Sequence, residues 1–115
     1  FVALFLDNRH RLIRMSRVAI GSLSVTVVHP RELFREAITA HAAAIILAHN
    51  HPSGDPGPSA HDVQLTRRLV EAGRLMGIEV LDHIIIGREG VVSLKASGLM
   101  EVASGGARGR RTRNA

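Results

Sequence analysis

The chain has 115 residues, of which 45% are hydrophobic, and it carries a formal net charge of +5 at pH 7. This length corresponds to one domain with a modest core, and the apolar content is typical of a globular chain rather than a disordered one. The absence of Cys excludes disulfides, thiolate metal sites and cysteine nucleophiles, and it fits a cytoplasmic location. No membrane-spanning run or signal peptide is visible, and the start at Phe1 without a Met suggests a domain cut from a longer protein.

The positive charge is concentrated at the C-terminus. The tail contains four arginines and no acid: Arg108, Arg110, Arg111 and Arg113. Removing these four charges from the total of +5 leaves +1 for the rest of the chain. We therefore divide the chain into a domain over residues 1–102 and a disordered Gly/Arg-rich tail over 103–115. Such a tail predicts weak, sequence-independent contact with DNA phosphates, although a purely solvated tail is the simpler interpretation.

Two strands are predicted at the N-terminus. Residues 1–7 form an apolar run and residues 10–20 a second run with partial alternation, and the polar turn DNRH separates them. After a break at Gly21, residues 23–28 predict a short extended segment.

A helix is predicted to begin at Pro30. Proline is favoured at the first helical position, and Glu32 suits the positive end of the helix dipole. An apolar face at helical spacing supports this helix: Phe34, Ile38, His41 and Ile45.

The second half of the chain alternates between strands and one long helix. Its elements are a central apolar strand over 44–48, a helix over 59–76 closed by Gly77, strands over 78–87 and 91–94, and a short turn or helix over 95–100. The order of all these elements predicts a mixed α/β domain with both hairpin and crossover connections.

The segment AHNHPSGDPGPSAHD, residues 48–62, is rich in polar residues and richer in proline than any other part of the chain. His49 and His51 directly follow the apolar strand, and residues two apart in an extended chain point to the same side. Their imidazoles can therefore converge on one point. The prolines and glycines that follow predict a stiff, tightly turned loop.

The sequence allows two interpretations of Asp62. The pattern Ser59-x-x-Asp62 before a helical run resembles a capping box, in which Ser59 is the N-cap. Asp62 also begins a stripe at helical spacing that would face the core: Asp62, Leu65, Leu69, Ala72 and Met76. A carboxylate that faces inward needs a partner, which two imidazoles and a cation would supply.

Together, His49, His51 and Asp62 form a candidate set of three metal ligands. Three protein ligands with a fourth position left to water are typical of catalytic zinc, and this donor set favours zinc. The predicted chemistry is hydrolysis, with an amide bond as the expected target.

The remaining histidines have structural interpretations. His41 is expected in an apolar helical stripe, and His61 is expected to face outward from the first turn of the long helix. His83 and Asp82 are neighbours in a strand and point to opposite faces, so at most one of them could support the metal site.

The pattern His49-x-His51-Pro52, followed by Ser59-x-x-Asp62, resembles the signature of the JAMM (MPN+) zinc metalloproteases. The longer string AHNHPSGDPGPSAHD, with HPRELFREAI before it and LDHIIIG after it, resembles the RadC family of bacterial proteins over roughly residues 1–100. The resemblance implies a JAB1/MPN, cytidine-deaminase-like fold, a three-layer-like mixed sheet with flanking helices. It also implies zinc held by the two histidines and the aspartate, with Ser59 stabilising the oxyanion.

The sequence departs from the JAMM pattern at one point. That pattern includes an upstream glutamate as general base, which we expect just before the first strand, and the run FVALFLD contains no Glu. The leading hypothesis is a zinc-dependent peptide or isopeptide hydrolase. Two alternatives stay open: a non-catalytic DNA-repair-associated module and a protein-interaction module that has kept the fold without turnover. The sequence does not indicate the oligomeric state.

Overall fold

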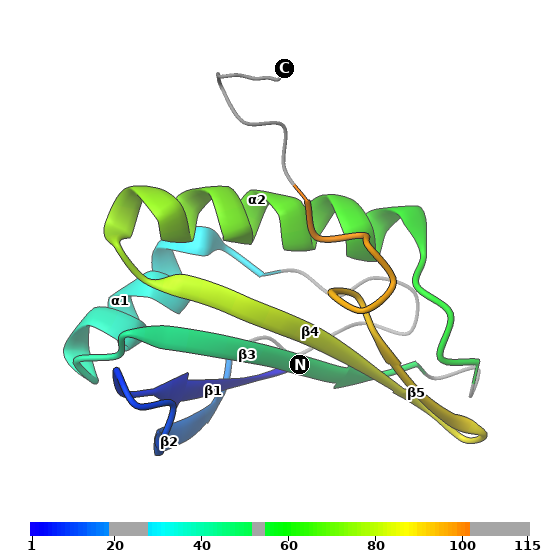
Figure 1. The fold of residues 1–115 in the computed structure, drawn as a ribbon, viewed down its shortest axis with the longest axis horizontal. Helices are drawn as coiled ribbons and strands as arrows, with labels where there is room; N and C mark the ends of the chain where they lie inside the picture. The colour runs from blue at the N-terminus through cyan, green and yellow to red at the C-terminus, as the bar shows by residue number, and fades with distance from the viewer. Residues whose placement is uncertain (19–27, 52–54, 102–115) are drawn as a thin grey trace.

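The computed structural model describes residues 1–18, 28–51 and 55–101. Its elements are β1 (Val2–Leu6), β2 (Leu12–Arg17), α1 (Pro30–Thr39), β3 (Ala44–Asn50), α2 (Ala60–Met76), β4 (Glu79–Gly87) and β5 (Gly90–Ser93) (Figure 1). The extended segment predicted over 23–28 lies outside the described residues except for Val28, and the arginine tail over 103–115 lies outside them entirely. None of the described helices is long and apolar enough to cross a membrane.

The five strands form one mixed sheet in the order β2-β1-β3-β4-β5. β1 pairs antiparallel with both β2 and β3, β3 pairs parallel with β4, and β4 pairs antiparallel with β5. The apolar strand β3 lies in the centre, as its continuous hydrophobic run predicts. The parallel pair β3–β4 requires a crossover, and α2 supplies it.

Both described helices cover the same face of the sheet. One row of paired residues runs across four strands: Ser16, Ala3, Leu47 and His83. The Ser16 hydroxyl donates to Glu36 of α1 at 2.6 Å, and His83 contacts Thr66 of α2 at 2.6 Å. Because directly paired side chains lie on one face, the described residues form two layers rather than the expected three.

The helix α1 is shorter than its predicted apolar stripe. Its buried residues are Leu33, Phe34 and Ala37, whereas Ile38 is 55% exposed. The helix ends because His41 adopts a left-handed conformation with φ of 58°, while the N–H of Ala42 donates to the carbonyl of Ala37. This turn is a Schellman motif, and it places His41 at the surface rather than in an apolar stripe.

The helix α2 runs along β4 and is capped at both ends as predicted (Figure 1). The inward positions of Asp62, Leu65 and Leu69 are confirmed, but Met76 is 54% exposed. The buried stripe ends at Gly73 instead, because a Cβ there would lie 2.3 Å from the carbonyl oxygen of Ile78. The absence of a side chain lets the helix approach the chain that leads into β4.

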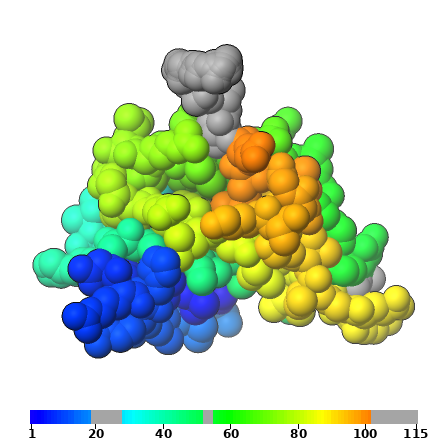
Figure 2. All heavy atoms as spheres, in the orientation of Figure 1, coloured from blue at the N-terminus to red at the C-terminus, as the bar shows by residue number. Residues whose placement is uncertain are grey.

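The segment after β5 closes the domain against α2. Figure 2 shows these residues as an orange surface that meets the green surface of α2. Leu94 and Met100 belong to the hydrophobic core, and the Arg67 guanidinium of α2 donates to the carbonyl of Leu99 at 3.2 Å. The core therefore continues beyond the last strand.

Candidate metal centre

The predicted ligands meet where β3 ends and α2 begins. His49 lies at the end of β3, His51 directly follows this strand, and Asp62 lies in the first turn of α2. One ligand atom from each of the three residues lies within 4.8 Å of the others. His49 is 7% exposed and Asp62 is 6% exposed, so the cluster lies at the edge of the core rather than on the surface. The convergence expected from the His-x-His spacing is therefore present.

The atoms that face one another are those a metal would use. His51 Nε2 lies 2.8 Å from Asp62 Oδ2, and His49 Nε2 lies 3.5 Å from Asp62 Oδ1. The two imidazole rings are tilted at 59° to each other, with their centroids 5.0 Å apart. Two nitrogens and a carboxylate therefore surround one small volume.

The proton on His51 can be assigned from its other nitrogen. Nδ1 lies 2.8 Å from the backbone oxygen of Asp55, and a carbonyl oxygen can only accept a hydrogen bond. Nδ1 must therefore carry a proton, which in the neutral ring leaves a lone pair on Nε2 facing the Asp62 carboxylate. A metal ion bound between them would satisfy both the nitrogen lone pair and the carboxylate. The donor set thus fits a divalent cation.

Asp62 satisfies both of its predicted readings at once. Its Oδ2 accepts from the backbone N–H of Ser59 at 2.9 Å, and its own N–H donates to Ser59 Oγ at 3.1 Å, which completes a capping box. Burial by itself raises the pKa of the Asp62 carboxyl, but hydrogen bonds from Ser59 and the proximity of His51 and His49 outweigh burial. The pKa therefore lies below its usual value, and the side chain is a carboxylate.

Ser59 lies beside the cluster at the surface. Its hydroxyl oxygen accepts from the Asp62 N–H, which confirms the predicted N-cap. Accepting this bond leaves the hydroxyl proton able to donate to another group. The predicted role of Ser59 toward an oxyanion stays a prediction.

Two residues lie beneath the cluster: His83, which the sequence left as a possible support of the metal site, and Thr66, to which it gave no role. His83 of β4 is fully buried, and its Nε2 lies 2.8 Å from His49 Nδ1. Its other nitrogen, Nδ1, lies 2.6 Å from the hydroxyl of Thr66. Burial lowers the pKa of His83 to about 4, with a further contribution from His49, so this ring is neutral at pH 7. Its neighbour Asp82 points elsewhere and accepts from the Ser93 hydroxyl at 2.7 Å.

Phe1 forms an apolar wall on one side of the cluster. Its ring stacks on His49 with centroids 5.5 Å apart and meets His83 edge-on at 5.2 Å. Burial lowers the pKa of His49, and the nearby carboxylate of Asp62 opposes this shift. His49 is therefore held as a neutral imidazole, which is the form that binds a metal.

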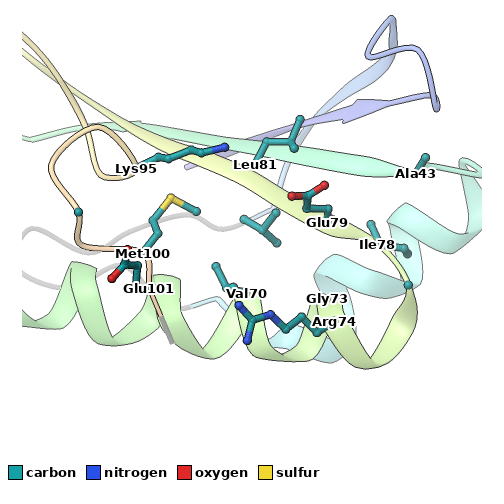
Figure 3. A pocket seen from close by; sticks show the side chains of 13 residues that line it. Ala43, Val70, Gly73, Arg74, Ile78, Glu79, Leu81, Lys95, Met100 and Glu101 are labelled. Carbon is teal, nitrogen blue, oxygen red and sulfur yellow. The ribbon is translucent and has the colours of Figure 1, made fainter. Parts of the chain in front are cut away.

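A cavity between α2 and the sheet lies away from this cluster. It has a volume of about 660 Å³ and lies between the end of α2, the start of β4 and the C-terminal segment (Figure 3). Val70, Glu79, Lys95 and Met100 are among the residues that line it, and none of the three candidate ligands does. The chemistry of the ligand cluster, rather than the cavity, therefore marks the candidate site.

Comparison with known proteins identifies the family of this chain. The family model described as a RadC-like JAB domain matches residues 1–99. A UPF0758 protein of Syntrophomonas wolfei is 55% identical over 100 residues, which are 87% of this chain and 43% of that protein. A UPF0758 protein of Bacillus mycoides and one of Bacillus cereus are each 56% identical over 98 residues, which are 85% of this chain and 44% of theirs. The chain thus spans less than half the length of these relatives, and it belongs to the RadC-like JAB domain family.

Proposed function

We propose that this chain is the metal-binding domain of a JAMM-type zinc hydrolase that cleaves peptide or isopeptide bonds. The observation that carries the proposal is the convergence of one ligand atom each from His49, His51 and Asp62 within 4.8 Å. Two imidazoles and one carboxylate are a donor set typical of catalytic zinc, which keeps a fourth position for water. Membership in the RadC-like JAB family supports the same chemistry.

Each residue of the cluster has a distinct task in this proposal. His49, His51 and Asp62 would hold the zinc, which when bound lowers the pKa of a water and polarises a carbonyl. Ser59 lies next to Asp62 at the surface, and its free hydroxyl proton would donate to the oxygen of the substrate carbonyl. Phe1 keeps water away from one side of His49.

The proposed mechanism also needs a general base. Glu32 and Glu36, the nearest upstream acids, do not serve: Glu32 pairs with Arg35, and Glu36 accepts from the hydroxyl of Ser16 on β2, the strand at the edge of the sheet. Val2 pairs with Ala48 in the antiparallel β1–β3 ladder, so residues attached before Phe1 would continue alongside the end of β3. A glutamate supplied from that direction would enter the ligand cluster.

The alternatives have less support. A DNA-associated module rests on the arginine tail, which lies outside the described residues, and a protein-interaction module has no distinguishing contact in the described site. A cytoplasmic location also stays a prediction. Removing residues 105–115 would test the tail: DNA binding that survives this truncation would contradict a role for its arginines.

The first test is the metal content of the purified chain. We expect about one zinc per chain in the wild type, and almost none in Asp62→Ala. Glu71→Ala, which removes an exposed acid from the same helix, is the matched control and should keep its zinc. A wild-type chain without zinc after supplementation, or an Asp62→Ala variant with full zinc, would refute the metal site.

The second test addresses hydrolysis. The protein extended upstream of Phe1 should cleave peptide or isopeptide substrates, and a chelator should abolish the cleavage. A zinc-loaded, extended protein that cleaves no member of a broad peptide and isopeptide set would favour the non-catalytic alternatives.

A further inference from the structure

A chain of hydrogen bonds connects the metal cluster to the interior of the domain. It runs from His49 on β3 to His83 on β4 and then to Thr66 on α2, over distances of 2.8 Å and 2.6 Å. His83 and Thr66 are both fully buried. Because neither residue can exchange its partner for water, the direction of each proton in this chain is constrained by the protein.

The direction is set at Thr66. Its hydroxyl lies 2.7 Å from the backbone oxygen of Asp62, which can only accept, so the single hydroxyl proton points there. The Thr66 oxygen then has to accept from His83, which places a proton on His83 Nδ1. If the hydroxyl turned toward His83 instead, two oxygens would face each other at 2.7 Å with no proton between them.

The proton on His83 Nδ1 in turn fixes the proton on the metal ligand His49. A neutral His83 with a proton on Nδ1 has a bare Nε2, which accepts from His49 Nδ1 at 2.8 Å. His49 then carries its proton on Nδ1, and its Nε2 lone pair faces Asp62. We propose that Thr66 and His83 are positioning residues that hold His49 in the tautomer able to bind zinc.

The inference rests on the proposed zinc site and adds to it the control of one ligand. His51 receives the same control from a backbone oxygen, which can never reverse. The acceptor for His49 is instead an imidazole, whose accepting nitrogen depends on a third residue. With the chain reversed, His49 would present an N–H to Asp62 and could not ligate a metal. Thr66 therefore determines whether the buried ligand His49 presents a lone pair to the metal.

Two substitutions at Thr66 separate this role from simple packing. Thr66→Val keeps the shape and removes the oxygen, whereas Thr66→Ser keeps the oxygen. In the valine variant, the N–H of His83 Nδ1 loses its acceptor, and the protonation pattern of both histidines should reverse. Loss of such a partner typically costs 10–100-fold in metal affinity, so we expect zinc affinity to fall about that much in Thr66→Val and to recover in Thr66→Ser.

The measurements are zinc titration of the three proteins and ¹⁵N NMR of the histidine rings in the zinc-free chain. We expect the zinc-free wild type to show His49 protonated at Nδ1 and bare at Nε2, and Thr66→Val to show the opposite. A proton on His49 Nε2 in the wild type, or equal zinc affinity in wild type and Thr66→Val, would overturn the inference.

The two proposals fail in different ways. A wild-type chain that binds no zinc refutes the proposed function, while its ring spectrum still decides whether the hydrogen-bond chain runs in the stated direction. The wild-type spectrum needs no variant, so the inference is decided even if Thr66→Val does not fold.

Discussion

Replacing Asp62 by Asn separates the two tasks that the carboxylate performs. In the structure, Oδ2 accepts from the Ser59 N–H, and the same carboxylate faces His49 and His51. An amide oxygen can accept the capping hydrogen bond as well as a carboxylate oxygen can, but a neutral amide is a poor zinc ligand. We therefore expect Asp62→Asn to fold nearly as well as the wild type without zinc and to lose the stabilisation that zinc provides.

The size of the effect follows from binding linkage. Zinc present at 100 times its dissociation constant stabilises the native state by about 2.7 kcal/mol. For a domain of this size, that corresponds to a rise in Tm of roughly 10–20 °C. The capping box is worth only about 1 kcal/mol, so an intact cap limits the change in the zinc-free variant to less than that.

The assay is thermal unfolding followed by circular dichroism, with zinc and with chelator. Ser59→Ala is the matched control, because it removes the N-cap side chain but no metal ligand. It should lose about 1 kcal/mol in both conditions and keep the full zinc-dependent rise in Tm. If Asp62→Asn shows the same rise as the wild type, then Asp62 is not a ligand and is only a cap.

Three further predictions concern stability without zinc. Gly73→Ala should destabilise the chain by about 1–3 kcal/mol in urea unfolding, because its Cβ would lie 2.3 Å from the Ile78 oxygen. This clash outweighs the better helix propensity of Ala. An unchanged unfolding midpoint would contradict the close approach of the backbone at Gly73. His41→Gly should stabilise by about 1 kcal/mol, because φ of 58° is strained for His and free for Gly, and a loss of stability would show that the imidazole makes a needed contact. The pKa of His83 is about 4 in the folded chain, against a usual value of 6.5 in an unfolded chain. Between pH 6.5 and pH 4, only the unfolded chain binds a proton at His83, so the free energy of unfolding falls as the pH drops through this range. The loss caused by His83 is about 3 kcal/mol, and this part should be absent in His83→Phe when unfolding is measured at each pH.

The parts of the site that the sequence predicted correctly are local. The alternation of His49 and His51 beyond an apolar strand requires only that the strand continue for two residues. The capping pattern at Ser59 and Asp62 requires only that a helix begin there, and Gly77 marks its end through a left-handed conformation. Each of these inferences depends on the backbone within a few residues, and each is confirmed.

The part of the site that was missed depends on a contact between distant segments. His83 supports His49 because β4 pairs parallel with β3, with a register shift near Ile46, and no local pattern fixes that register. Only the register that places His83 opposite Leu47, two residues before His49 on the same face, reveals the contact. The early end of α1 was missed because His41, a residue with a side chain, occupies a turn position that usually signals itself with Gly.

The metal ligands lie close to one another along the chain, whereas His83, which orients one of them, lies much farther away. His51 and Asp62 are 11 residues apart, whereas His49 and His83 are 34 apart. Closing the longer loop costs about 1 kcal/mol more in chain entropy, and it also requires β4 to join the sheet. During folding, the ligand set can therefore assemble within the β3–α2 unit before the hydrogen bond that selects its tautomer exists. Transient opening of β4 would break this hydrogen bond first. The proton of His49 could then move to its other ring nitrogen while the three ligand side chains remain in place.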